Sequence, residues 1–274
     1  MILGIDIGGT TTDIVGFKDK EILGFLSVKA SDPIASASGA LGKFLSVYSL
    51  SLEDIDKIAI TGVGSSYIDL DLFGIKTIKV NEFESIGFGG TYLSDLDQAI
   101  VVSMGTGTAI VKVNKGTVKH LGGSGVGGGT LIGLGKGLLN TVDFNNIVEM
   151  AEKGDISTID LQLADISQIT IGSLKKEITV SNFGKFTDKA SKDDQASGIL
   201  NIIFQTIGMM SIFAAKIEHD ENIIFTGKLA KIEYGQNILN GLITSKFFDG
   251  NFKFPEYAEY STAIGAAICL LKDK

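Results

Sequence analysis

The chain has 274 residues, of which 44% are apolar, and a formal net charge of −8. This length and apolar content suffice to bury two moderate cores. No block of lysine or arginine is present to bind a phosphate backbone, so the composition argues against a nucleic-acid partner. The single cysteine, Cys269, excludes an internal disulfide and a cysteine-built metal site, and we expect it to be a small core residue.

The N-terminus enters a predicted strand directly, without a charged leader, and no stretch of about 18 residues is apolar throughout. We therefore expect a cytoplasmic protein that makes no membrane contact. Glycine is frequent, with 35 residues against two prolines, which indicates many tight turns and no disordered linker.

The first predicted element is a β-hairpin in residues 1–17, followed by a third strand at Glu21–Val28. Its apolar first strand ends at Asp6, and a turn of glycine and threonine follows: Gly8, Gly9, Thr10, Thr11 and Thr12. Such a turn lets a phosphate group approach backbone N–H groups. Because a carboxylate alone would repel phosphate, we interpret Asp6 as a Mg²⁺ site that acts through water. A plain glycine hairpin is the alternative interpretation.

A helix is predicted for residues 31–50, with Ser31 or Asp32 as its cap, and strands for Lys57–Thr61 and Lys76–Val80. The loop of residues 62–66 either touches a substrate or is a simple turn.

Two carboxylates, Glu82 and Glu84, open a predicted helix that extends to Leu96. Glu82 lies directly beyond the C-terminal end of a strand, where open α/β sheets place ligand chemistry. A kinase needs a group there to accept the proton of the attacking hydroxyl, and we assign this role to Glu82. We interpret Glu84 as a favourable partner of the helix dipole.

Residues 101–113 repeat the design of the first hairpin, with a turn of small residues at Gly105–Thr108. Two such hairpins predict a duplicated sheet domain that clamps a nucleoside triphosphate between its copies. We place the boundary between the two lobes at residue 97, which gives segments 1–97 and 98–274.

The glycine-richest segment, residues 122–137, follows a strand at Gly116–Lys119 and His120. Its middle opens an apolar helix at residues 131–140, and the residues before that helix are Gly127, Gly128, Gly129 and Thr130. Backbone amides at a helix start form an anion or nucleotide cradle. Close helix packing through glycine is the alternative.

The last part of the chain mainly supplies structural elements of the fold. One long helix is predicted for residues 190–218, a strand for residues 222–226, and a closing helix for residues 261–271. We interpret the turn at Gly227, which ends the strand, as the adenosine side of the nucleotide site.

Six motifs together resemble the type II pantothenate kinases of the actin-like ATPase superfamily, which also holds sugar kinases, heat-shock chaperones and actin. The motifs are DIGGT (6–10), NEFE (81–84), SMGTGTA (103–109), GGSGVGGGTLIGLGKGLL (122–139), EMAEKGD (149–155) and TVSNFGK (179–185). The resemblance implies an α/β fold of two actin-like (ribonuclease H-like) lobes. Each lobe is a mixed sheet flanked by helices, and the nucleotide binds in the cleft between them.

The resemblance also implies an activity: transfer of the ATP γ-phosphate, with Mg²⁺, to the primary hydroxyl of pantothenate in the first step of coenzyme A biosynthesis. By motif position, Glu82 matches the catalytic base of the family. Asp6 keeps the catalytic metal-binding role assigned to it above. The implied ATP-binding residues are Gly8, Gly9, Thr10, Thr11, Gly105, Thr106, Gly127, Gly128, Gly129, Thr130 and Gly227. The implied substrate-binding residues are Glu82, Thr106, His120 and Gly122.

Two positions depart from the family. His120 stands where relatives usually have a substrate-binding arginine, and Asp13 stands where several have a lysine near the phosphates. A neutral imidazole lacks the charge and the bidentate geometry of arginine. The substrate carboxylate and the phosphates then need other cations, and we name Lys112, Lys119 and Lys185 as candidates.

Relatives in this family are dimers joined through helices of the second lobe, so Met209, Met210 and Phe213 are our candidate interface; packing inside the monomer is the alternative. Three other functions stay open at this point. They are an ATP-dependent kinase of an N-acetylhexosamine, an activator ATPase without an acceptor, and a degenerate regulator that binds coenzyme A species.

Overall fold

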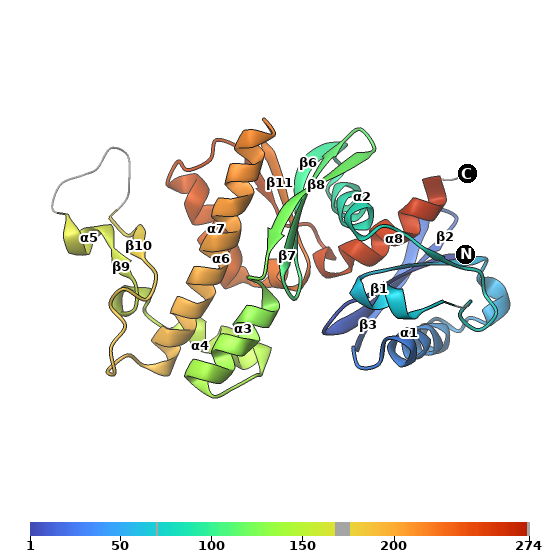
Figure 1. The fold of residues 1–274 in the computed structure, drawn as a ribbon, viewed down its shortest axis with the longest axis horizontal. Coiled ribbons are helices and arrows are strands. Elements are labelled where there is room, and N and C mark those ends of the chain that lie inside the picture. Colours follow the sequence, from blue (N-terminus) through green and yellow to red (C-terminus); the bar gives the residue numbers. More distant parts are fainter. Residues whose placement is uncertain (70, 168–175, 273–274) are drawn as a thin grey trace.

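Two five-stranded mixed sheets organise the chain (Figure 1). The structure is a computed structural model that describes residues 1–69, 71–167 and 176–272. The first sheet has the strand order β3-β2-β1-β4-β5, and the second has the order β12-β11-β6-β7-β8. The strands of the first sheet are β1 (Ile2–Ile7), β2 (Thr11–Lys18), β3 (Glu21–Lys29), β4 (Lys57–Thr61) and β5 (Thr77–Lys79). The strands of the second are β6 (Gln98–Met104), β7 (Thr108–Asn114), β8 (Thr117–Ser124), β11 (Asn222–Thr226) and β12 (Asn251–Lys253).

The two sheets share one topology. In each, three consecutive antiparallel strands form a meander, and two parallel strands extend the sheet on the other side of its first strand. β1 therefore corresponds to β6, β2 to β7, and β4 to β11. This repetition confirms the predicted duplication of a mixed sheet.

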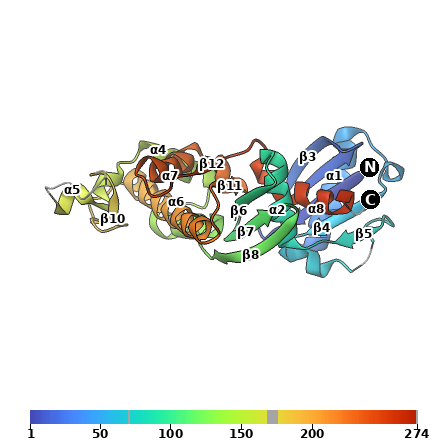
Figure 2. The ribbon, with the colours of Figure 1, turned by 90° about the horizontal axis from the view of Figure 1, so that it is seen from above.

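Two helices lie between the sheets and join them (Figures 1 and 2). The helix α2 (Glu82–Ser94) covers the second sheet, and α8 (Ser261–Lys272) covers the first. The two helices pack closely because a Cβ at Gly89 would collide with the carbonyl of Ser261, and a Cβ at Gly265 with that of Ser85. The closing helix of the chain thus returns to the first sheet, while the division of the chain at residue 97 stays a prediction.

The outer face of the first sheet is covered by α1 (Pro33–Tyr48), which buries Phe44 and Leu41. The Asp32 carboxylate accepts a hydrogen bond from the Ala35 N–H, so Asp32 is the cap and Ser31 is not. Cys269 is half-buried on α8.

The second lobe is built around α6 (Lys192–Ile217), which buries Ile199, Ile203 and Phe204. An 18-residue window of α6 has a mean hydropathy of 1.7, so this helix is long and apolar enough to cross a membrane. Of that window, 61% is buried inside the protein, as in the core helix of a lobe. The sequence analysis, which looked for a stretch of about 18 residues that is apolar throughout, underestimated the hydropathy of this helix. The helices beside it are α3 (Gly128–Leu134), a π-helical turn (Gly135–Leu139), α4 (Phe144–Lys153) and α7 (Glu233–Thr244).

A small extension holds β9 (Leu161–Gln162), α5 (Leu163–Ile166) and β10 (Thr179–Ser181) at the far end of the second lobe (Figure 1). The fully buried carboxylate of Asp160 ties it to α6. It accepts hydrogen bonds from Asn201 Nδ2 at 2.6 Å, Phe183 N at 2.8 Å and Asn182 Nδ2 at 3.0 Å. Much of the TVSNFGK motif therefore has an architectural role.

Candidate active site

The turns of the two hairpins face each other across the lobes. Thr10 Oγ1 and Thr106 Oγ1 lie 3.0 Å apart and share a hydrogen bond. Each turn is a short link between a buried strand and its antiparallel partner, so backbone N–H groups of both hairpins border the same space. The opposed arrangement predicted for the hairpins is the one observed.

Two adjoining cavities share this floor. Both are lined by Asp6, Gly8, Gly9, Gly105, Thr106 and Thr262. One cavity, of about 290 Å³, continues to Gly227 and Lys228, and we name it the Gly227 cavity. The other, of about 400 Å³, continues to Gly62 and Glu82, and we name it the Glu82 cavity. A ligand that spans both would place its middle part against the hairpins.

A polar row crosses the first sheet beneath these cavities. Asp6 on β1 is paired with Asp13 on β2 and with Thr61 on β4, and Asp13 is paired with Ser27 on β3. Directly paired residues point to the same face of a sheet, so the two carboxylates are neighbours. Burial, and after it the negative charges of Asp13 and Glu82, together raise the pKa of Asp6 from 3.8 to about 7. The paired strand residues of the row include no cation of their own. The charge of Lys228, which comes from the second lobe, lowers the pKa of Asp6.

This row fits a Mg²⁺ ion. Asp13 Oδ1 and Thr61 Oγ1 are buried and have no hydrogen-bond partner among the described residues. Mg²⁺ prefers oxygen ligands and usually binds through one or two carboxylates, water and substrate phosphates. No group of three or more histidine, cysteine or acidic residues with metal-binding geometry occurs in the described residues. Asp6 would therefore hold the ion together with water and substrate phosphates.

Glu82 is the first residue of α2, where the Asn81 side chain caps the helix by accepting from the N–H groups of Phe83 and Glu84. Its side chain is half-buried, lines the Glu82 cavity, and has its pKa raised by burial. Glu84 is exposed and lines neither cavity. Only the first of the two predicted candidates for the base therefore faces the cleft.

The triple glycine packs on the second hairpin. The N–H groups of Gly128 and Gly129 each donate to a carbonyl, of Gly105 and Thr106 respectively, at 2.8 Å. The Gly127 N–H donates to Thr130 Oγ1 at 3.2 Å. These amides thus hold α3 against the second hairpin. The sequence analysis gave glycine packing between helices as the alternative, whereas here the glycines pack a helix start on a hairpin. Gly128 lines the Gly227 cavity, and phosphate binding by this helix start stays a prediction.

Two glycines hold corresponding positions in the two lobes. Gly62 follows β4 with φ +83°, and Gly227 follows β11 with φ +85°, a region that favours glycine. A Cβ at Gly62 would collide with Asp6 Oδ1 and the Ile7 carbonyl, and one at Gly227 with the backbone of Met104. Both glycines therefore let a strand end approach the floor of the cleft.

The cations proposed from the sequence lie elsewhere. Lys112 forms a buried ion pair with Asp220, Lys119 pairs with Glu218 at 2.8 Å, and Lys185 pairs with Asp165 at 2.7 Å. None of the three lines the Gly227 or the Glu82 cavity. Sequence reasoning missed Lys228, which does line the Gly227 cavity. Its place directly after the strand end at Gly227 is the signal that could have found it.

His120 and Gly122 are not in the cleft. They line a separate cavity of about 520 Å³ between β8 and α6, together with Met210 and Phe213. The His120 ring stacks on Phe83, with centroids 3.8 Å apart. Ser124, further along β8, lines the Glu82 cavity instead. A role of His120 and Gly122 in substrate binding stays a prediction.

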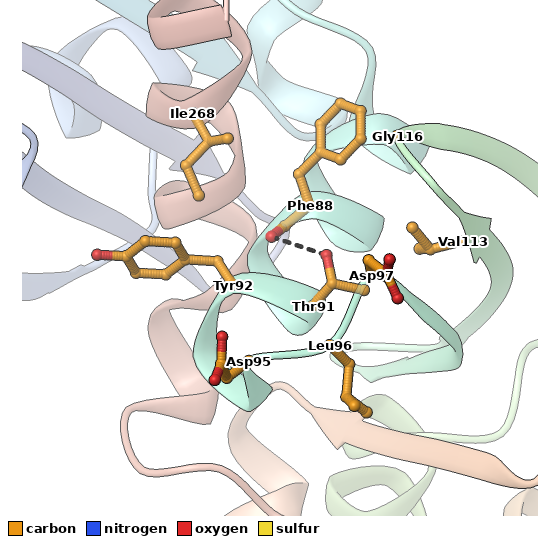
Figure 3. Close-up of a pocket in the computed structure, with 9 residues that line it drawn as sticks. All are labelled: Phe88, Thr91, Tyr92, Asp95, Leu96, Asp97, Val113, Gly116 and Ile268. Carbon is orange, nitrogen blue, oxygen red and sulfur yellow. Dashed lines mark hydrogen bonds between the residues drawn. The ribbon is translucent and has the colours of Figure 1, made fainter.

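A larger hollow of about 570 Å³ lies at the C-terminal end of α2, beside the turn between β7 and β8 and beside α8 (Figure 3). Its lining includes the carboxylates of Asp95 and Asp97 and the Thr91 hydroxyl, which donates to the Phe88 carbonyl at 3.3 Å. No lysine lines it, so phosphate groups would meet only negative charge there. The two cavities at the hairpins are the better nucleotide site.

Comparisons with known proteins agree with this geometry. A family model described as Fumble matches residues 94–269. A type II pantothenate kinase from Bacillus cereus is 30% identical over 240 residues, which cover 82% of each chain. Component A of the (R)-2-hydroxyglutaryl-CoA dehydratase from Acidaminococcus fermentans has a TM-score of 0.70 at 20% identity and covers 99% of this chain and 98% of its own.

A ROK family glucokinase from Streptomyces griseus, solved with glucose and AMPPNP, has a TM-score of 0.62 at 13% identity and covers 98% of both chains. At these identities the solved structures show the fold, which is that of the actin-like ATPases and ROK kinases, as predicted. The family match and the 30% identity together show that the chain belongs to the family of the type II pantothenate kinases.

Proposed function

We propose that this protein phosphorylates pantothenate, transferring the γ-phosphoryl group of ATP to its primary hydroxyl in the first step of coenzyme A biosynthesis. One observation carries the proposal. A half-buried carboxylate, Glu82, and a second carboxylate, Asp6, face one floor built by two opposed hairpins. This arrangement supports the reaction that the names of the relatives describe.

The roles of the residues follow from the two cavities. The phosphates of ATP would lie against the turn residues Gly8, Gly9, Thr10 and Thr106, with the adenosine side toward Gly227. The acceptor hydroxyl would approach from the Glu82 cavity, where Glu82 takes its proton. Asp6 would hold Mg²⁺, which when bound would neutralise charge on the phosphoryl oxygens. Phosphoryl transfer depends mainly on such positioning and charge stabilisation.

A homodimer in the cytoplasm is part of the proposal. Phe213 and Ile217 on α6 expose 55% and 74% of their surface, and Met209 and Met210 are partly buried beside them. An exposed apolar stripe of this kind marks interaction surfaces. Light scattering during size-exclusion chromatography tests it: Phe213→Asp should turn a dimer into a monomer, and a monomeric wild-type protein would contradict the dimer.

The experiment that tests the activity is a coupled ADP-release assay with ATP and Mg²⁺. Pantothenate, pantetheine, N-acetylmannosamine and no acceptor are compared at equal concentrations. We expect turnover with pantothenate and none with the amino sugar. Turnover with the sugar alone would identify a hexosamine kinase, and equal turnover without any acceptor would identify an ATPase.

A further inference from the structure

The Gly227 cavity has an unusual charge balance for a site that would bind a polyanion. Its lining contains three carboxylates, Asp6, Asp13 and Glu259, and among these described lining residues one lysine, Lys228. The sequence contains no arginine that could help. Phosphate groups in this cavity therefore have one cationic side chain to meet.

The backbone fixes where this lysine points. Lys228 begins a 3₁₀ turn (Lys228–Lys231) directly after Gly227, whose close approach to Met104 sets the start of the turn. The Lys228 Nζ donates to Ser27 Oγ at 3.2 Å and lies 3.6 Å from Asp13 Oδ1. Ser27 and Asp13 are cross-strand neighbours on the first sheet. The ammonium group thus crosses from the second lobe onto the polar row of the first.

The pairing with Asp13 is incomplete. A separation of 3.6 Å is too long for a hydrogen bond, and Asp13 Oδ1 accepts no direct hydrogen bond within the described residues, although Asp13 is only 5% exposed. The other carboxylate oxygen, Asp13 Oδ2, accepts from Thr11 Oγ1 at 3.3 Å. The lysine side chain stays 38% exposed, and its ammonium group carries three N–H donors. Lys228 is therefore held near the hairpins with donors to spare.

We propose that Lys228 binds the phosphate oxygens of the nucleotide, and that Asp13 and Ser27 hold it over the hairpin turns until those oxygens arrive. This inference rests on the proposed function, because it assigns the phosphates to the Gly227 cavity. It makes Lys228 a phosphate-binding residue and Asp13 its positioning residue. Asp13 and the phosphates then compete for the same cation.

The experiment is direct binding of ATP and of adenosine, by calorimetry without acceptor, to wild type, Lys228→Met and a control variant. A charge-assisted hydrogen bond of this kind predicts ATP affinity weakened about 10- to 100-fold in Lys228→Met. Adenosine affinity should stay unchanged, because adenosine carries no phosphate. The control is Lys185→Met, which removes a lysine of similar exposure, paired with an aspartate outside both cavities, and should bind ATP as wild type does.

A second variant separates a binding role from a folding defect. In Lys228→Met, the Asp13 carboxylate loses its cationic neighbour and still faces the phosphates. Adding Asp13→Asn should therefore recover part of the lost ATP affinity, by about 3- to 10-fold. Lys228→Met with wild-type ATP affinity would overturn the inference, as would equal losses for ATP and adenosine. If either result is found while the wild-type protein phosphorylates pantothenate, the proposed function stands and only the role of Lys228 is wrong. A wild-type protein that binds no ATP would overturn both the proposed function and the role of Lys228.

Discussion

The two lobes have the same topology and opposite chemistry at the cleft. In the first, Asp6 at the end of β1 is paired with Asp13 on β2; in the second, Ser103 at the end of β6 is paired with Ala109 on β7. The residue after the glycine at the strand end is Val63 in the first lobe, 67% exposed, and Lys228 in the second. The paired carboxylates Asp6 and Asp13 thus belong to the first lobe, and Lys228 belongs to the second, which also contributes Glu259 to the Gly227 cavity.

This difference teaches how a duplicated fold becomes an asymmetric site. The shared features are backbone features, namely the tight hairpin turns and the positive-φ glycines Gly62 and Gly227. They build a symmetric floor of amides. In the function that we propose, the side chains on equivalent positions then take different roles: metal and proton chemistry would lie on the first lobe, and phosphate charge balance on the second.

The largest expected effect is the loss of the first lobe's base. Glu82→Gln should lower kcat about 10²- to 10⁴-fold, because a positioned base contributes that much to proton transfer. ATP affinity should stay nearly unchanged, since Glu82 lines the acceptor side. Steady-state kinetics at saturating ATP measures the effect.

The matched control is Glu84→Gln, which changes an exposed carboxylate two positions along α2. We expect it to be close to silent. If the ranking were reversed, the base would be Glu84, and two silent variants would point away from a kinase.

The second prediction tests the symmetry itself. Gly62→Ala and Gly227→Ala should each lower the free energy of unfolding by about 3–5 kcal/mol, because the added Cβ meets backbone atoms at a positive φ. The Ile7 carbonyl lies 2.7 Å from the Cβ built at Gly62, and the Met104 carbonyl 2.5 Å from that at Gly227. Denaturant unfolding measures both.

Gly74→Ala is the control, because Gly74 has φ +79° and open space around its Cβ. It isolates the cost of backbone conformation, which we expect to be about 1–2 kcal/mol. Equal losses at all three glycines would mean that the close approach of the strand ends contributes nothing.

Local sequence signals predicted much of this fold. The predicted strands at 57–61 and 222–226 have the observed bounds of β4 and β11, because short apolar runs next to glycine define both. The sequence analysis proposed no element for α4, α7 or β12. The amphipathic periods of α4 and α7 are short, and the three residues of β12 become a strand only by pairing with β11.

The site was predictable where one segment suffices. Glu82 reaches the cleft because a strand end and a helix start adjoin in sequence. Lys228 was missed because its meeting with Asp13 joins residues from different lobes. His120 and Gly122 line the cavity beside α6 and not the cleft. Next to them the pairing of β8 with β7 has a register shift, between Ile110 and Val111. No sequence pattern predicts this shift.

The third prediction concerns Asp6, where function and stability should oppose each other. Its pKa rises from 3.8 to about 7 in the folded protein, so the folded state binds more protons than the unfolded state in that interval. The stability contributed by its protonated form is present below about pH 4 and is lost as the pH rises through 7. Asp6→Asn removes this loss and should raise the free energy of unfolding at pH 8 by about 1–2 kcal/mol, within a limit of about 4 kcal/mol set by the shift.

Thermal unfolding at pH 4 and pH 8, without Mg²⁺ or nucleotide, measures the difference. The gain should vanish at pH 4, where wild-type Asp6 is protonated. In assays the same variant should need more Mg²⁺ and lose rate more than ATP affinity. A variant that keeps its rate would contradict the metal role, and a gain independent of pH would contradict the raised pKa.

The smallest expected effect is at the contact between the lobes, the hydrogen bond of Thr10 with Thr106. Both hydroxyls are exposed, so a double-mutant cycle of Thr10→Val and Thr106→Val should give a coupling of only about 0.5–1 kcal/mol in the free energy of unfolding. If the hydroxyls turn to the phosphates when ATP binds, each single variant should weaken ATP affinity about 3- to 10-fold, because each removes one donor to a charged oxygen. Thr117→Val, on the exposed part of β8, is the control and should change neither quantity. Coupling in stability with unchanged ATP affinity would mean that the hairpins touch each other without holding the phosphates, and the clamp would then have to be built from backbone amides alone.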